Sequence, residues 1–239
     1  MTPSRHRTID GPVEWLGDLV GLFLPRRCAA CDRPLTRSET SLCLGCLNDL
    51  PRLRLHQEPG NRVERLFWGK VPVEAAAALL QFNRSGKVQR MLHRLKYTGD
   101  RTVGLELGRM MAETLQGSER FSTLDTILAV PLHPSRLRQR GFNQSQVLVD
   151  GFREVWPLRS MHQSLMRVTR TTTQTHKGRW DRWTNVKEAF DLVSPEVLAG
   201  AHVLVVDDVV TTGATLEGCI RALTSAPGLR VSVCTAATA

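Results

Sequence analysis

The stretch from Val203 to Leu216 reads VLVVDDVVTTGATL: an apolar run, two adjacent carboxylates, two more apolar residues and a short segment rich in Thr and Gly. A short apolar run of this kind is typical of a strand that is buried on both faces, as in a parallel sheet. Ligands of such sheets bind beyond the carboxyl ends of the strands, where we expect Asp207 and Asp208 to lie. The stretch therefore places two negative charges beside a segment suited to an anion.

The segment after the acids is expected to hold a phosphate. It runs from Val209 to Gly213 into a predicted helix, whose free N–H groups and positive dipole end attract anions. The threonine hydroxyls add hydrogen-bond donors, and a glycine lets the backbone approach the ligand closely. The residues expected to contact the phosphate are Thr211, Thr212, Gly213, Ala214 and Thr215.

The two carboxylates must then face a part of the ligand that donates hydrogen bonds or becomes positive. Ribose hydroxyls donate to carboxylates, and a ribose gains oxocarbenium character when its C1 bond breaks. A 5-phosphorylated ribose activated at C1 therefore suits both the acids and the phosphate segment. Asp207 and Asp208 are the candidate catalytic residues. The alternative is an ordinary acid pair that caps a helix at the end of a strand.

Helical and strand patterns alternate through the second half of the chain. An α/β fold is expected, with a parallel sheet covered by helices on both faces. Asn143 or Ser145 is expected to cap one helix. The predicted strands are 126–131, 165–168, 202–206 and 230–238, and the predicted helices are 85–98, 104–115, 143–156 and 214–225.

Four of the six cysteines form two CxxC pairs that are separated by eleven residues. Two such pairs can place four thiolates tetrahedrally around Zn²⁺, and a site closed by four protein ligands is structural rather than catalytic. Two disulfides, a redox pair and an iron–sulfur cluster are the alternatives. The expected zinc ligands are Cys28, Cys31, Cys43 and Cys46, whereas Cys219 and Cys234 are expected to be small core residues.

Composition and charge bound the class of protein. The chain has 239 residues, and its 41% hydrophobic content is enough for a core. Its net charge of +9 favours anionic partners such as phosphates, nucleotides and nucleic acid. The apolar stretch 15–23 is too short to span a membrane and is broken by Asp18, so we expect an amphipathic helix, no membrane insertion and a cytoplasmic protein.

The order of several motifs resembles that of the ComF family, the competence-associated branch of type I phosphoribosyltransferase-like proteins. The similarity runs from about residue 15 to the C-terminus. It implies a phosphoribosyltransferase-like domain at 65–239, after an N-terminal helix and zinc-finger module at 1–55, with residues 50–62 as a polar connector. The motifs are LFLPRRCAAC (22–31), HRLKYTGDR (93–101), VPLHPSRLRQRGFNQS (130–145), QTHKGRWDRWTNVKEAF (174–190) and VDDVVTTGAT (206–215).

The resemblance also implies a ligand, 5-phosphoribosyl-1-pyrophosphate (PRPP), bound with Mg²⁺. By this resemblance, segment 131–140 holds the pyrophosphate and segment 167–185 closes over it; a solvated basic turn and a nucleic-acid groove with Trp180 and Trp183 are the alternatives. Many relatives carry Gly-Leu where this chain has His176-Lys177. The implied contacts are Pro131, Arg136, Arg140, Lys96, Arg170, Lys177, Arg179 and Arg182, of which Lys96 could equally belong to a surface helix end.

Two functions of different class are compatible with these motifs. One is a phosphoribosyltransferase that moves the sugar phosphate from PRPP to a nitrogen acceptor and releases pyrophosphate. The other, implied by the ComF resemblance, is a DNA-uptake factor that acts on single-stranded DNA beside a competence helicase. The chain has no glutaminase segment and no recognisable acceptor-binding hood, so the complete glutamine-using amidotransferase reaction is not supported.

Overall fold

The chain divides into two units, Met1–Asp49 and Leu50–Ala239. This computed structural model describes residues 25–84, 86–161, 164–168 and 189–239. The amphipathic helix expected at 15–23 lies outside the described residues. Within these residues, no helix is both long enough and apolar enough to cross a membrane.

The described part of the first unit consists of a tight turn followed by one short helix. Arg27 and Pro34 form an isolated antiparallel bridge, and the turn between them contains Asp32 with a φ of 65°. Helix α2 (Leu44–Asn48) begins directly after Cys43. Each CxxC pair therefore lies at a point where the backbone changes direction.

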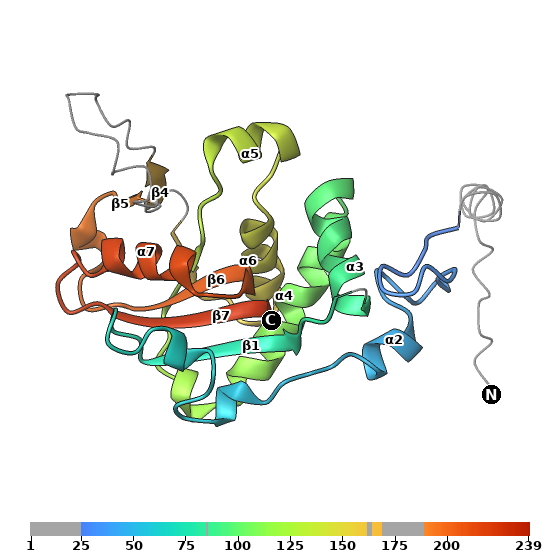
Figure 1. The fold of residues 1–239 in the computed structure, drawn as a ribbon, viewed down its shortest axis with the longest axis horizontal. Helices are drawn as coiled ribbons and strands as arrows, with labels where there is room; N and C mark the ends of the chain where they lie inside the picture. Colours follow the sequence, from blue (N-terminus) through green and yellow to red (C-terminus); the bar gives the residue numbers. More distant parts are fainter. Residues whose placement is uncertain (1–24, 85, 162–163, 169–188) are drawn as a thin grey trace, which may run out of the picture. The chain divides into compact units, whose positions relative to one another are not determined.

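A five-stranded parallel sheet forms the centre of the second unit, in the order β1-β7-β6-β2-β3 (Figure 1). The two longest strands, β6 and β7, lie next to each other and are almost wholly buried. This agrees with the parallel sheet predicted from the apolar runs. The bounds are β1 (Ala75–Gln81), β2 (Thr126–Ala129), β3 (Arg159–Ser160), β6 (His202–Val210) and β7 (Arg230–Thr238).

Helices cover both faces of this sheet (Figure 1). Helices α4 (Arg101–Gln116) and α6 (Gln144–Val155) pack together on one face, and α7 (Ala214–Leu223) packs against β6 on the other. Cys219 in α7 and Cys234 in β7 are buried core residues, as predicted. The remaining elements are α3 (Lys87–His93), α5 (Pro134–Arg140), the π-helix η3 (Arg94–Thr98) and the 3₁₀ helices η1 (Leu55–Gln57), η2 (Glu64–Leu66), η4 (Glu119–Phe121) and η6 (Pro195–Leu198).

Residues 50–62, predicted as a polar connector, are instead part of the second unit. The amide of Leu53 donates to the carbonyl of Leu79 in β1 at 2.8 Å, and Leu55 is buried. Asn61 is buried too, and its amide group donates to the carbonyl of Ala76 at 2.8 Å. Because the polar groups are satisfied by hydrogen bonds, a polar sequence is compatible with this packed position.

Strand β1 was not predicted, and the strand predicted at 165–168 lies outside the main sheet. Alanine-rich residues 75–78 carry little strand signal, yet they are buried in β1. Strand β4 (Leu165–Val168) pairs antiparallel with β5 (Ala189–Leu192) as a separate two-stranded sheet near α7. The residues that join these two strands lie outside the described residues.

Two glycines allow α4 and α6 to cross in very close contact. A Cβ atom placed on Gly108 would lie 2.1 Å from the carbonyl oxygen of Leu148. One placed on Gly151 would lie 2.1 Å from the carbonyl oxygen of Leu105. Both obstructing atoms belong to backbone, so neither contact can be relieved by a side-chain rotation. The spacing of α4 and α6 therefore depends on these two positions.

We expect Gly108→Ala to lower the free energy of unfolding by about 3 kcal/mol, because the added methyl group forces two backbones apart. Gly117→Ala is the matched control, since nothing lies within 4 Å of its Cβ position and its φ is −86°. Urea unfolding of the two variants measures the difference. Equal stability of the two variants would contradict the close crossing.

Candidate functional site

Asp207 and Asp208 lie where one neighbour of β6 has ended and the other continues. On one side, the pairing with β2 stops at Ala129 opposite Val206. On the other side, β6 stays paired with β7 as far as Val210 opposite Thr238. The strand is thus longer than the predicted 202–206, and the loop after it shorter. Because β2 ends before β7 does, space is left beside the two acids at the carboxyl edge of the sheet.

The carboxylate of Asp207 is held by two hydrogen bonds to one oxygen. The Ser145 hydroxyl donates to Oδ1 at 2.9 Å, and the amide of Asp208 donates to the same atom at 2.8 Å. Burial raises the pKa of Asp207 to about 7, and repulsion by Asp208 adds to the rise. These two hydrogen bonds and the charge of Lys96 lower the pKa but do not offset the increase.

Asp208 is buried and contacts a lysine rather than a hydroxyl. The ammonium of Lys96 lies 2.8 Å from its Oδ2. Lys96 belongs to the π-helix η3, which continues α3 and ends at Gly99 with a φ of 71°. Short π-helical segments are often found at functional sites, because they redirect side chains within a helix. Here the segment places a cation on the second acid.

The Thr- and Gly-rich segment forms a small hollow of about 50 Å³ in front of α7. Gly213 is the N-cap of α7 with a φ of 79°, and a Cβ atom there would lie 3.3 Å from Leu66 and Phe67. Gly213 has no side chain to cap this helix end, and the amide of Ala214 donates only weakly to the Thr212 hydroxyl, at 3.5 Å, so the first turn keeps N–H groups for a ligand. The lining residues are Asp207, Val209, Val210, Thr211, Thr212, Gly213, Ala214, Thr215 and Leu216.

A second, larger pocket of about 430 Å³ is strongly basic. Helix α5 forms one wall, and η3 with the turn after it forms the other. Arg140 donates to the Gln144 side chain at 2.8 Å and lies over the ring of Tyr97 at 5.4 Å, which fixes its position. Of these groups, Lys96 also reaches Asp208. The lining residues are Lys96, Tyr97, Gly99, Arg136, Gln139, Arg140 and Phe142.

The acid pair lies between these two cavities and is connected to both. Asp207 lines the hollow in front of α7, and Asp208 contacts a lysine that lines the basic pocket. The two acids thus have different neighbours although they are adjacent in β6. An extended ligand with an anionic group at each end and hydroxyls between them would match this arrangement.

The structure brings most of the expected contact residues together, with exceptions. Arg136 and Arg140 share the basic pocket with Lys96. Pro131 lines a neighbouring, more apolar pocket of about 360 Å³ instead. The 131–140 segment is not an open loop, since most of it forms α5. Arg170, Lys177, Arg179 and Arg182, with Trp180 and Trp183, lie outside the described residues.

Sequence reasoning missed the contacts of Ser145 and Tyr97. Ser145 was considered only as a helix cap, a role that Asn143 fulfils by accepting from the Ser145 amide at 3.1 Å. The Asn143 side chain also donates to the carbonyl of Val130 at 2.9 Å, which ties α6 to the end of β2. A polar GFNQS segment between a strand and an amphipathic helix was the available signal. It indicated a cap but not a hydroxyl aimed at Asp207.

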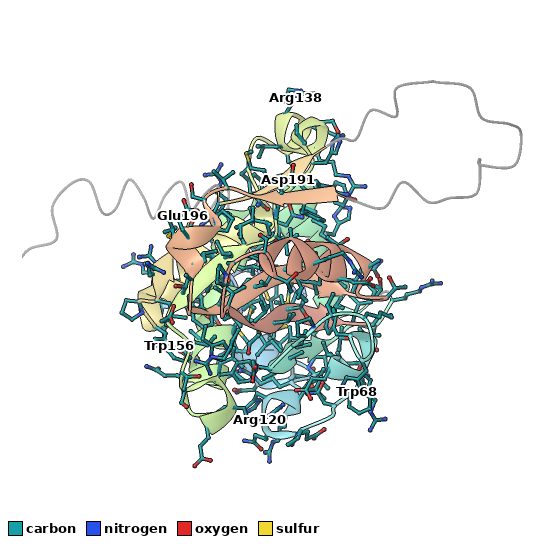
Figure 2. The ribbon with its side chains drawn as sticks, turned by 90° about the vertical axis from the view of Figure 1, so that its left-hand side faces the viewer. Trp68, Arg120, Arg138, Trp156, Asp191 and Glu196 are labelled. Carbon is teal, nitrogen blue, oxygen red and sulfur yellow. The ribbon has the colours of Figure 1, made fainter. Side chains whose placement is uncertain are left out.

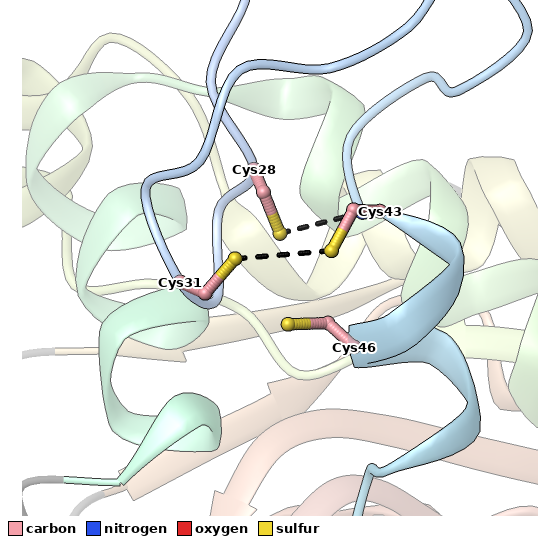
Figure 3. Close-up of side chains that lie close together, drawn as sticks. All are labelled: Cys28, Cys31, Cys43 and Cys46. Carbon is pink, nitrogen blue, oxygen red and sulfur yellow. Dashed lines mark hydrogen bonds between the residues drawn. The ribbon is translucent and has the colours of Figure 1, made fainter.

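The four cysteines of the first unit converge on one point (Figure 3). Their sulfur atoms all lie within 4.8 Å of one another, and Cys31 and Cys43 are 3.8 Å apart. Zn–S bonds of about 2.3 Å in a tetrahedron imply sulfur–sulfur distances of about 3.8 Å, so the cluster fits a metal ion of this size. The amide of Cys43 donates to the sulfur of Cys28 at 3.3 Å.

Arg33 favours the thiolate form within this cluster. Its guanidinium donates to the sulfur of Cys43 at 3.3 Å and lowers the pKa of that thiol to about 6. Burial instead raises the pKa of Cys46. Four thiolates this close repel one another, and a divalent cation removes this repulsion. The four cysteines can therefore hold a metal ion, and their donor atoms suit zinc.

Comparison with known proteins agrees with the fold and the motifs. A model of the phosphoribosyl transferase domain matches residues 160–239. The competence protein F of Haemophilus influenzae is 31% identical over 216 residues, covering 82% of this chain and 89% of that protein. The DNA utilization protein YhgH of Salmonella typhi is 29% identical over 206 residues, with coverage of 82% and 89%. YhgH of Escherichia coli K12 is 29% identical over 192 residues, with coverage of 79% and 80%.

The raised pKa of Asp207 predicts a stability that depends on pH. The folded state keeps its proton up to a pH of about 7, whereas the unfolded state loses it near the ordinary value of 3.8. Raising the pH through this window therefore destabilises the folded state. We expect the wild type to lose about 2 kcal/mol more than Asp207→Asn between about pH 5 and pH 8, after allowance for partial exposure of the carboxylate.

Urea unfolding of both proteins at the two pH values measures this difference. Asn keeps an oxygen that accepts from Ser145 and from the Asp208 amide, so the variant removes only the charge. Because the groups away from Asp207 titrate alike in the two proteins, parallel pH profiles would mean that Asp207 is ionised normally in the folded state.

Proposed function

The chain belongs to the ComF family, and from this premise we propose that its phosphoribosyltransferase-like domain binds PRPP with Mg²⁺ in support of DNA uptake. The observation that carries the proposal is the position of Asp207 and Asp208 between an anion-binding helix end and a basic pocket. PRPP has a phosphate at C5, hydroxyls at C2 and C3 and a pyrophosphate at C1. It therefore matches both cavities and the acids between them.

Each part of the site has a role in this proposal. The 5-phosphate would accept hydrogen bonds from the loop and the first turn of α7, at residues 211–215. The ribose hydroxyls would donate to Asp207 and Asp208, and Ser145 would orient Asp207 for them. The pyrophosphate would lie in the basic pocket with Arg136 and Arg140. Lys177, Arg179 and Arg182 would add charge to it from the 167–185 segment.

The acids are also the groups that would face Mg²⁺. Asp207 and Asp208 would hold the ion indirectly, by accepting hydrogen bonds from the ribose of the ligand. When bound, Mg²⁺ supplies positive charge that neutralises the pyrophosphate. The residues themselves would hold the sugar in place and exclude water from C1.

The link to DNA comes from the family. Relatives are named for competence and for DNA utilization, and we extend this to a cytoplasmic role on single-stranded DNA beside a competence helicase. The net charge of +9 is consistent with an anionic polymer as partner.

Transfer of the phosphoribosyl group is the second candidate function. It is favoured by the acids occurring together with the Thr- and Gly-rich hollow and the basic pocket, although the sequence has no recognisable acceptor-binding hood. The carboxylates would stabilise positive charge on the ribose as pyrophosphate departs from C1. A nitrogen acceptor would then form the new C1 bond and lose its proton.

For the cysteine cluster we propose structural zinc. All four donors are protein thiolates, so no coordination position would remain open for a substrate. A unit of this size has little core, and a metal ion would stabilise its fold.

PRPP binding is tested by calorimetric titration in the presence of Mg²⁺. At about pH 8, above the pKa of about 7 of Asp207, we expect the wild type to bind and Asp207→Asn to bind about 100-fold more weakly, because a charged hydrogen-bond acceptor for the ribose is lost. Asp191→Asn in β5 removes an exposed carboxylate outside both cavities and should bind like the wild type (Figure 2).

Two further measurements separate the functions. Steady release of pyrophosphate with a nitrogen acceptor would favour the transferase, whereas binding without turnover would favour a ligand-binding role in DNA uptake. Single-stranded DNA binding is expected at low salt and should weaken as salt rises. If the wild type does not bind PRPP, the proposed ligand is wrong. If it binds no single-stranded DNA at low salt, the proposed role on DNA is wrong.

Zinc content gives an independent prediction. We expect about one zinc ion per chain in the wild type and its loss in Cys28→Ser, since three thiolates hold zinc less tightly than four. Cys219→Ala, in α7, should keep the metal. Elemental analysis of the purified proteins measures both. A folded wild type without metal would refute the zinc assignment.

A further inference from the structure

The contact between Lys96 and Asp208 occupies a site that the ribose needs. The Lys96 ammonium lies 2.8 Å from Oδ2 of Asp208. That oxygen is buried and has no hydrogen-bond partner otherwise among the described residues. In the proposed function, ribose hydroxyls donate to this carboxylate. A sugar must therefore displace the lysine before it can bind there.

The Lys96 side chain can move from Asp208 into the basic pocket. It lines the basic pocket, next to Arg136 and Arg140, and is partly exposed. The backbone beneath it is held by Leu95, which is fully buried. Movement is thus confined to the side chain, whose several rotatable bonds allow the ammonium to turn from the acid toward the pocket.

Whether displacement of Lys96 from Asp208 is favourable depends on the group that the ligand carries at C1. A ligand with a pyrophosphate at C1 gives the displaced ammonium a new anion in the basic pocket. A sugar without that group, such as ribose 5-phosphate, gives it none. The second ligand must break an ion pair in a partly buried site and obtains no compensating interaction. The same lysine therefore opposes one sugar phosphate and assists the other.

We propose that Lys96 is a specificity-determining counter-ion that favours pyrophosphate-bearing ribose 5-phosphates over ribose 5-phosphate itself. This inference rests on the proposed binding of PRPP. In the ligand-free protein, Lys96 neutralises Asp208; in the complex, it neutralises the pyrophosphate. The site thereby rejects the sugar that hydrolysis of PRPP would leave behind.

Two simpler roles for Lys96 give different results on substitution. If Lys96 were only a phosphate ligand, its loss would weaken PRPP binding and leave ribose 5-phosphate unaffected. If the ion pair only supported the fold, its loss would weaken both ligands. The counter-ion role alone predicts effects of opposite sign on the two sugars.

Calorimetric titration of wild type and Lys96→Met with each sugar, at one fixed Mg²⁺ concentration, tests the proposal. We expect the variant to bind PRPP about tenfold more weakly and ribose 5-phosphate about tenfold more tightly, each corresponding to about 1.4 kcal/mol. Lys96→Gln, which keeps a polar end without the charge, should shift both affinities in the same directions. Lys96→Gln provides a second measurement of both affinities if the methionine variant folds poorly.

Arg138→Met is the matched control for loss of one positive charge. Arg138 lies exposed on α5 near the pocket but does not line it (Figure 2). Both affinities should stay near wild-type values in this variant. A shift of the kind seen with Lys96→Met would reduce the effect to general electrostatics and overturn the proposal.

The remaining outcomes are decisive as well. If both Lys96 variants bind ribose 5-phosphate as the wild type does, or more weakly, the counter-ion role fails while PRPP binding stands. If the wild type binds neither sugar phosphate, the proposed function fails and this inference fails with it.

Discussion

Two neighbouring carboxylates at the edge of a buried sheet are the constraint on which the rest of the site depends. Removing water from a charge is unfavourable, and a second like charge on the next residue makes it more so. Groups from several surrounding elements offset part of this unfavourable free energy. Ser145 at the start of α6 and the Asp208 amide support Asp207, while Lys96 in η3 supports Asp208. The compensation is incomplete, because the pKa of Asp207 remains raised.

The fold makes these contacts available by bringing three distant segments to one edge. The unequal ends of β2 and β7 around β6 place the acids at the carboxyl edge of the sheet, and Asn143 ties the start of α6 to the end of β2. The close crossing of α4 and α6 then fixes where α6 begins. A change in helix spacing would move Ser145 away from Asp207, so packing far from the ligand contributes to the position of the acid.

Local patterns in the sequence predicted most of the elements around the acids but not the contacts between them. The apolar run before Asp207 predicted a buried strand, and the spacing of four cysteines predicted a cluster, because both signals lie within a few residues. Strand β1 escaped prediction because alanines carry little strand preference, and residues 50–62 because a buried Asn satisfied by the β1 backbone looks polar in sequence. The partners of Asp207 and Asp208 lie 62 and more residues away, beyond any local pattern.

Negative charge is concentrated in both units, but it is compensated by different groups in each. In the larger unit the carboxylates are two, and a hydroxyl, an amide and one lysine of the chain compensate them in part. In the smaller unit up to four thiolates share a space in which sulfur atoms lie within 4.8 Å, and Arg33 offsets only part of that charge. A small unit has little apolar burial with which to oppose the remaining repulsion. A divalent cation can remove this repulsion in the smaller unit, whereas the acids of the larger unit are compensated by groups of the chain itself.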